Sequence, residues 1–233
     1  IAVAFVGSLL LLEPDMGAFL VIAAVAMGIL FLGGVNGKLF GGLVLTAIST
    51  FSLLIVASPW RRERIFAYLN PWQEQYAQGK AYQLTHSLIA FGRGEWTGVG
   101  LGGSIEKLHY LPEAHTDFML AILGEEFGFI GITTVLALEF IMLACCIRIG
   151  QRALKNNYLR AGYLAYGISM IFLMQILVNA GMNMGMLPTK GLTLPFISYG
   201  GTSLMMCAVM ISLVLKIDAT TQNVNPSIEE SSF

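Results

Sequence analysis

Long apolar runs dominate the chain, and a few polar or glycine-rich breaks separate them. Five windows hold almost no charge: 16–37, 39–60, 127–147, 161–189 and 191–215. A helix needs about 20 predominantly apolar residues to cross the hydrocarbon core of a membrane, and each window reaches that length. The pattern therefore predicts five full-length transmembrane helices.

The two ends of the chain differ from these windows. Residues 1–12 are apolar but too short to span a membrane, and they lack an initiator Met and the basic start of a signal peptide. We interpret them as the end of a crossing that begins upstream, which predicts that the chain is the C-terminal part of a longer protein. Residues 219–233 are polar and predict a disordered tail.

The composition excludes several classes of protein. Of the 233 residues, 56% are hydrophobic and 12% are charged, and the net charge is -1; soluble domains average about 25% charged residues. These values exclude a disordered chain, a water-soluble globule and a nucleic-acid binder with a basic face. The cysteines Cys145, Cys146 and Cys207 lie in apolar runs, so we expect them in the core or facing lipid.

One long segment, 61–117, does not fit a membrane. Residues 61–116 include six basic residues, five acidic residues and three histidines. Within it, Ala81–Phe91 carries apolar residues at helical spacing and predicts a short helix. A loop of this length in a compact protein is usually functional. Lys and Arg residues are spread almost evenly over the two sides of the membrane, so charge alone leaves its side open.

The strongest candidate for chemistry is Asp117, where the long loop meets the apolar run that follows. Partial desolvation at such a boundary raises a carboxyl pKa and makes the group a better general base. An Asp just before a helix is equally typical of a cap, and the two roles can coexist. Glu125 and Glu126 follow shortly after, and we favour structural ion pairs with loop arginines for them over catalysis.

A second candidate region runs from Gln175 to Ser203. Gln175, Asn179 and Asn183 are spaced four residues apart, so they share one helix face, which is typical of polar contacts that join membrane helices. Residues 185–203 contain two prolines and several glycines, which predicts irregular backbone that lines a cavity or is buried in protein. Lys190 is the charge in this segment, either an anion contact or part of a re-entrant plug. A transporter and a membrane-embedded enzyme are both compatible with these residues.

The same residues resemble the SEDS family (shape, elongation, division and sporulation). Its signature is an Asn, five residues, a Gly and, three residues later, a Pro, followed by Ser-Tyr-Gly-Gly-Ser/Thr-Ser, and 179–203 matches it without a gap. Three further motifs, 90–95, 112–118 and 188–193, are similar to those of the division branch of the family rather than the elongation branch. The resemblance extends from Glu13 to about Asp218 and covers almost the whole chain.

The resemblance implies an all-α polytopic membrane protein, a bundle of about ten helices of which this chain resembles the last six. It implies one transmembrane domain over 1–218, with the long loop 61–117 in the periplasm, a re-entrant signature segment 185–203 and a cytoplasmic tail 219–233. The implied location is the bacterial inner membrane at the division septum, with the active site facing the periplasm.

The implied activity is that of a glycosyltransferase that polymerises lipid II into β-1,4 peptidoglycan strands. Asp117 matches the aspartate that the family needs for polymerisation, as general base, and undecaprenyl pyrophosphate is the leaving group. Lipid II flipping, a scaffold role in division and an elongation-type polymerase stay open as alternatives. The implied partners are a class B penicillin-binding protein and other division membrane proteins, and no nucleic acid.

The resemblance also directs the choice of substrate-binding residues. Positive charge near the leaving diphosphate is expected from Lys190 and Arg93, with Lys107 behind them. The other residues that we predict to bind substrate lie in two of the matched motifs, 112–118 and 179–203. They are Glu113, His115, Thr116 and Ser198. A metal requirement stays open, with Mg²⁺ or Mn²⁺ as the candidate divalent cation.

Overall fold

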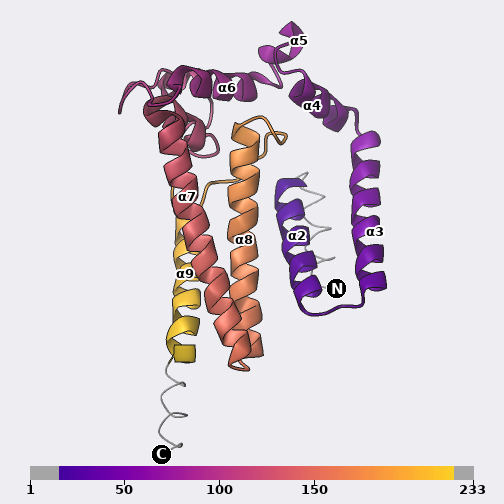
Figure 1. The fold of residues 1–233 in the computed structure, drawn as a ribbon. Coiled ribbons are helices and arrows are strands. Elements are labelled where there is room, and N and C mark those ends of the chain that lie inside the picture. Colours follow the sequence, from indigo (N-terminus) through magenta and orange to yellow (C-terminus); the bar gives the residue numbers. More distant parts are fainter. Residues whose placement is uncertain (1–15, 223–233) are drawn as a thin grey trace, which may run out of the picture. The chain divides into compact units, whose positions relative to one another are not determined.

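The computed structural model describes residues 16–222, and its regular elements are all helices (Figure 1). The predicted all-α class is confirmed. In chain order the elements are α2 (Met16–Leu32), α3 (Gly37–Val56), α4 (Pro59–Leu69), α5 (Glu74–Ala77), α6 (Tyr82–Gly94), the π-helical turn η1 (Glu106–Tyr110), α7 (Met119–Lys155), α8 (Leu159–Asn183) and α9 (Gly201–Gln222).

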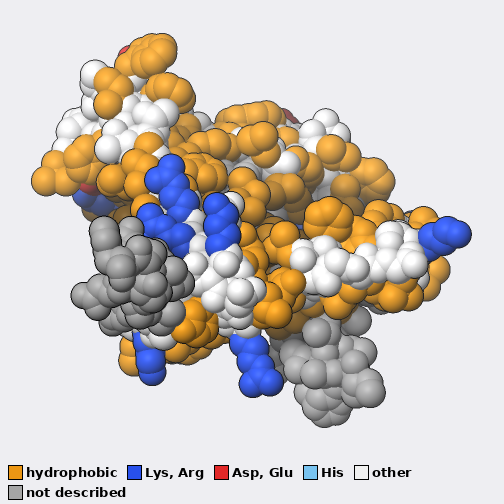
Figure 2. Space-filling view, turned by 60° about the horizontal axis from the view of Figure 1, so that its bottom comes forward, with side chains coloured by type: hydrophobic (Ala, Val, Ile, Leu, Met, Phe, Trp, Pro, Cys, Tyr) orange, Lys and Arg blue, Asp and Glu red, His pale blue; other side chains and the backbone are white. Residues whose placement is uncertain are grey.

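Each of the five predicted windows contains a long part of a helix. Within the described residues, α7, α8 and α9 are long and apolar enough to cross a membrane, and two shorter apolar stretches, 17–32 and 37–53, correspond to the first two windows. Large apolar side chains remain exposed on these helices, among them Leu45, Leu138 and Leu215. Hydrophobic side chains also cover much of the face in Figure 2, with few Lys and Arg side chains between them. The chain is therefore a multi-pass membrane protein.

The chain forms two compact units, each assembled from separated stretches of sequence. Unit 1 comprises 1–34, 138–174 and 201–233. In its described part, α7, α8 and α9 pack through a buried cluster made of Leu143, Cys146, Ile168, Phe172, Cys207 and Val214. Cys146 and Cys207 are buried, Cys145 is exposed, and all three are free thiols, as the apolar context predicted.

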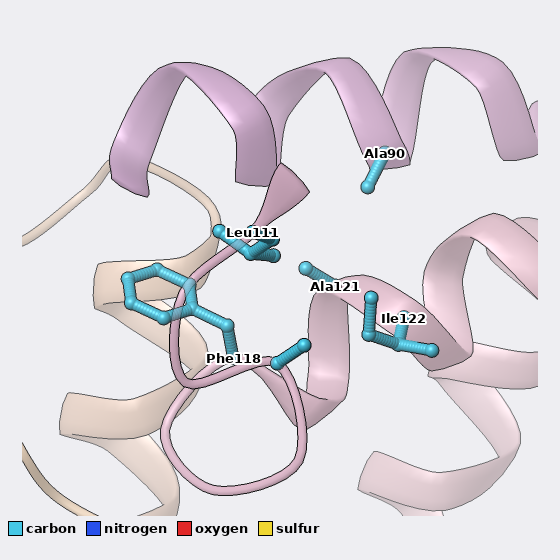
Figure 3. Close-up of a cluster of buried hydrophobic side chains, with 6 residues drawn as sticks. Ala90, Leu111, Phe118, Ala121 and Ile122 are labelled. Atoms are coloured by element: carbon cyan, nitrogen blue, oxygen red, sulfur yellow. The ribbon is translucent and has the colours of Figure 1, made fainter. Parts of the chain in front are cut away.

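Unit 2 comprises 35–137 and 175–200 and contains most of the candidate chemistry. One buried cluster joins α6 to the start of α7 and includes Ala90, Leu111, Phe118 and Ile122 (Figure 3). A second cluster joins α7, α8 and the segment after α8 through Leu120, Ile132, Ile176 and Leu194. The helix predicted at Ala81–Phe91 is confirmed as α6, which runs three residues further, to Gly94.

Helix α7 is interrupted at Gly128, whose φ of 66° and ψ of -164° lie outside the helical region. The backbone there pairs with the segment after α6: Val99 N–H donates to the Glu125 carbonyl at 2.9 Å, and Phe129 N–H donates to the Glu95 carbonyl at 2.9 Å. A Cβ on Gly94 would lie 1.9 Å from the Gly124 carbonyl oxygen, so only glycine permits this approach. Glycine at these positions thus permits the close backbone contact between the long loop and α7.

Two predicted segments differ in extent from the observed ones. The irregular backbone predicted for 185–203 is confirmed for 185–200, and it begins one residue earlier, at 184, whereas Gly201–Ser203 already belong to α9. Helix α9 continues to Gln222, so the predicted tail boundary at 218 falls inside a helix. Residues 223–233, and the predicted crossing end at 1–12, lie outside the described residues.

Candidate functional site

Asp117 lies between the long loop and α7, and two amides from α8 hold its backbone. Asn179 and Asn183 each donate from Nδ2 to the Asp117 carbonyl oxygen at 2.9 Å. Both amides are 0% exposed, and a buried polar group is costly unless it is hydrogen-bonded. The residue that the sequence singled out as a base is therefore anchored through its main chain by two residues of the signature.

The same two amides reach further neighbours. Asn179 Nδ2 also donates to the Leu192 carbonyl at 2.6 Å, and Asn183 Oδ1 accepts from Ala121 N–H at 3.2 Å. The prediction that the polar side chains on one face of this helix join it to neighbouring segments is confirmed for Asn179 and Asn183. The N–H of Ala121, near the start of α7, is capped by Asn183, although the sequence offered Asp117 for that role.

The side chain of Asp117 is half-buried and faces the signature segment. A Cβ built on Gly191 would lie 3.3 Å from Asp117 Oδ2, so the missing side chain of Gly191 leaves the carboxylate its space. Burial raises the pKa of Asp117 above its ordinary value, and the negative charge of Glu113 raises that pKa further. Asp117 thus has the raised pKa that the sequence predicted for a base at a membrane boundary.

The turn that carries Asp117 is closed by Glu113. The Glu113 carbonyl accepts from Thr116 N–H at 3.2 Å and from Phe118 N–H at 3.1 Å, while Thr116 Oγ1 donates to Glu113 Oε2 at 2.7 Å. Glu113 has a positive φ of 57°, which is uncommon outside glycine. The predicted residues Glu113 and Thr116 therefore shape the loop around Asp117 through their own contacts.

The signature segment meets this turn at its backbone. Tyr199 N–H donates to the His115 carbonyl at 2.9 Å, and buried Ser198 accepts from Leu194 N–H through Oγ at 2.9 Å. The side chain of His115 is exposed. Ser198 therefore stabilises the irregular backbone beside the turn, while His115 presents its ring to the surroundings.

Two of the three predicted cations form ion pairs with α7. Arg93 Nη1 lies 2.7 Å from Glu125 Oε1, and Lys107 Nζ lies 2.5 Å from Glu126 Oε1. The structural ion pairs predicted for Glu125 and Glu126 are confirmed, with a lysine as the partner of Glu126. The third cation, Lys190, is half-buried in the segment next to Gly191, and its N–H contacts Met182 Sδ at 3.3 Å.

Sequence reasoning did not foresee how the long loop reaches Glu125. Ser104 Oγ and the N–H groups of Ile105 and Glu106 all donate to that carboxylate. These residues carry no motif, and backbone donors leave no trace in the sequence. The spacing of Asn179 and Asn183 identified them as a polar helix face, but it did not predict that they bind the Asp117 carbonyl.

Across residues 16–222 no group of three or more His, Cys, Asp or Glu side chains is arranged to hold a metal ion. Glu113 and Asp117 are two carboxylates of the same turn, and Mg²⁺ is commonly bound by one or two carboxylates together with substrate phosphates and water.

The long apolar helices define the class of polytopic membrane proteins. Within this class, the chain has a half-buried carboxylate, Asp117, on a backbone held by two buried asparagines. The family described as "Cell cycle protein" (FtsW/RodA/SpoVE) matches residues 1–223. The chain belongs to this family, as the SEDS resemblance predicted.

Relatives and solved structures agree with this assignment. The chain is 62% identical over 217 residues to a probable peptidoglycan glycosyltransferase FtsW of Burkholderia thailandensis, covering 93% of this chain and 47% of the relative. It is 62% identical over 225 residues to a protein of the same description from Acinetobacter baylyi, covering 97% of this chain and 56% of the relative. The chain spans about half the length of these curated relatives.

Two solved structures share the fold. A chain from a peptidoglycan synthase complex, studied for its coordination of polymerization and crosslinking, matches with a TM-score of 0.69 and 26% identity, covering 93% of this chain and 59% of that one. The rod shape determining protein RodA of Thermus thermophilus matches with a TM-score of 0.58 and 27% identity, covering 92% of this chain and 53% of that one.

Proposed function

We propose that the protein is a peptidoglycan glycosyltransferase that polymerises lipid II during septal wall synthesis. The observation that carries this proposal is the Asp117 carboxylate, half-buried, with a raised pKa, on a turn anchored by Asn179 and Asn183. The relatives named as probable peptidoglycan glycosyltransferases supply the reaction class. A general base needs a pKa nearer the working pH than an exposed aspartate has, and the raised pKa of Asp117 supports this role.

In the proposed reaction, Asp117 accepts the proton of the 4-hydroxyl of an acceptor N-acetylglucosamine. The hydroxyl oxygen attacks the anomeric carbon of a donor N-acetylmuramic acid, the new β-1,4 bond forms, and the bond to undecaprenyl pyrophosphate breaks. A single displacement inverts the α-linked donor, as in inverting glycosidases with a sugar hydroxyl in place of water. General-base help of this kind contributes typically about 10²–10⁴-fold to the rate.

The leaving diphosphate needs neighbouring positive charge. Lys190 immediately precedes Gly191, the residue that abuts the Asp117 carboxylate, and for this reason we rank Lys190 first for the diphosphate. Arg93 and Lys107, which pair with Glu125 and Glu126, are the further candidates. A Mg²⁺ or Mn²⁺ ion bound together with the diphosphate would supply further positive charge there, and no step of this proposal passes through it.

Glu113, His115, Thr116 and Ser198 complete the proposed substrate site. Glu113 and Thr116 bond to each other in the turn, which favours a role in shaping the acceptor side. The exposed ring of His115 is available to a sugar or peptide group. Ser198 is buried and bonded to the backbone, so its proposed contribution to binding is through the segment that it stabilises.

The proposed setting is the bacterial inner membrane at the division septum, with the long loop in the periplasm. The solved complex that shares the fold is described as a peptidoglycan synthase coordinating polymerization and crosslinking. We propose a class B penicillin-binding protein as the crosslinking partner of this protein, together with other division membrane proteins.

The test is lipid II polymerisation by the full-length protein with its penicillin-binding partner, wild type against Asp117→Asn. Long glycan strands from the wild type alone are the expected result. Equal activity of both proteins would show that Asp117 is not the base. Absence of strands in both, with lipid II moved across vesicle membranes, would replace the polymerase with a flippase.

A further inference from the structure

The carboxylate of Glu125 is a second buried acidic site in unit 2, distinct from Asp117. Glu125 is 0% exposed. Its Oε1 accepts from Arg93 Nη1 at 2.7 Å and from Ile105 N–H at 3.0 Å, and its Oε2 accepts from Ser104 Oγ and from Glu106 N–H at 3.3 Å. Each oxygen thus has two donors, which is the arrangement that an ionised buried carboxylate requires.

Three of these four donors come from one short stretch, 104–106, and the fourth comes from the last turn of α6. The Arg93–Glu125 pair is one of several contacts between α6 and α7. Backbone hydrogen bonds join 95–100, directly after α6, to 125–130, and the cluster around Ala90, Phe118 and Ile122 packs α6 against the start of α7 (Figure 3). The Glu125 carboxylate accepts its three other hydrogen bonds from 104–106, so it is the main side-chain contact that holds this stretch.

The stretch 104–106 leads directly into the turn that carries Asp117. The Glu106 carbonyl accepts from Leu111 N–H at 2.9 Å, and Leu111 is buried in the same cluster as Phe118. From there, the Glu113 carbonyl accepts from Thr116 and Phe118 N–H. Residues 104–118 are thus fixed at both ends. Glu125 binds the first end, at 104–106, and Asn179 and Asn183 bind the other end at the Asp117 carbonyl.

We propose that Glu125 is a positioning residue for the reaction: through Ser104, Ile105 and Glu106 it holds the turn that places Asp117 against its substrate. This inference rests on the proposed glycosyltransferase function. Glu125 touches neither the acceptor sugar nor the diphosphate, and it acts by restricting where Asp117 lies. Misplacement of a reacting group by about 1 Å can cost on the order of 100-fold in rate.

The experiment compares Glu125→Gln with the wild type in the full-length protein bound to its partner. In the Gln variant an NH₂ group replaces one carboxylate oxygen and faces two donors, so the hydrogen bonds of that oxygen are lost. The segment 104–118 is then held less firmly at its first end. The expected result is a roughly 10- to 100-fold fall in the polymerisation rate per folded molecule at saturating lipid II. The acid limb of the pH–rate profile moves to lower pH, because a looser turn exposes Asp117 to water.

The matched control is Glu63→Gln, which removes the carboxylate of the exposed Lys80–Glu63 pair on the same long segment and should leave the rate unchanged. If Glu125→Gln folds poorly, Ser104→Ala removes a single donor and should reproduce the shifted acid limb with a smaller loss of rate. A lower melting temperature with an unchanged rate per folded molecule would overturn the positioning role. Inactive Asp117→Asn beside fully active Glu125→Gln would overturn this inference alone, and an inactive wild type would overturn both proposals.

Discussion

The two units of the chain differ in the share of buried polar contacts that stabilise them. In unit 1 the contacts between α7, α8 and α9 are mainly apolar, and the polar ones are peripheral, such as the 3.6 Å pair of Arg152 with Asp218. In unit 2 the apolar clusters are interleaved with buried polar groups, above all Asn179, Asn183 and Glu125.

The difference follows from what each unit contains. Regular helices satisfy their own backbone groups, so apolar packing suffices to join them in a membrane. Irregular backbone, as at 111–118 and 184–200, leaves N–H and C=O groups that side chains must satisfy. In unit 2, Asn179 and Asn183 bind the Asp117 carbonyl and Glu125 binds the stretch 104–106. The buried polar groups of unit 2 therefore lie where irregular backbone surrounds the candidate site.

The largest expected effect comes from removing the carboxylate that unit 2 surrounds. Asp117→Asn should lower polymerisation by at least about 100-fold, the lower range of general-base catalysis. Its folded pKa is raised, so the ionised group destabilises the fold at pH above its ordinary pKa, and the neutral amide should not lower the melting temperature. Strand length on gels and a thermal melt measure both, and a collapse of the melt would assign Asp117 a structural role.

A contrast between Asn183→Ala and Phe172→Ala tests the comparison of the two units directly. Asn183→Ala leaves Ala121 N–H without its side-chain acceptor and removes one donor from the Asp117 carbonyl, so the rate per folded molecule should fall by roughly 10-fold, as expected for a displaced base. Phe172→Ala opens a cavity in unit 1 and should lower stability by about 3–5 kcal/mol while the rate per folded molecule stays the same. Equal effects of both on that rate would contradict the division of roles.

The pH dependence of the reaction separates the two causes of the raised Asp117 pKa. A base works in its ionised form, so the rate falls as the pH drops through the folded pKa. Glu113→Gln removes the negative charge that contributes to the raised pKa, and the acid limb should move to lower pH. A pH–rate profile of the variant with its partner measures the shift. An unmoved limb would leave burial as the sole cause.

The smallest expected effect is steric. Gly191→Ala puts a methyl group 3.3 Å from Asp117 Oδ2, close enough to displace the carboxylate slightly, so the rate should fall only a few-fold. Gly41→Ala in α3, where a Cβ meets nothing within 4 Å, is the matched control. A rate equal to that of the control would mean that the space beside Asp117 is wider in the working protein.

The sequence predicted the helices well because hydrophobic length is a local property. Windows of apolar residues sufficed for the positions of α7, α8 and α9, and glycine and proline marked the irregular segment 184–200. Boundaries were less accurate: the predicted tail began at 219, whereas α9 reaches Gln222. In the last turn of α9, the Thr221 carbonyl accepts from Asn156 Nδ2 at 3.3 Å, a contact between residues far apart in the sequence.

The candidate site shows the same division. Asp117, Lys190 and the asparagine stripe stood out by residue type, spacing and family signature, all of which are written in the chain itself. Only the tertiary structure decided that Asn179 and Asn183 donate to the Asp117 carbonyl and that Arg93 and Lys107 pair with carboxylates. It also decided that Glu125 accepts from the Ser104 hydroxyl and from the backbone N–H groups of Ile105 and Glu106. Hydrogen bonds to backbone groups depend on which segments meet in space, and that meeting is set by packing between residues distant in sequence.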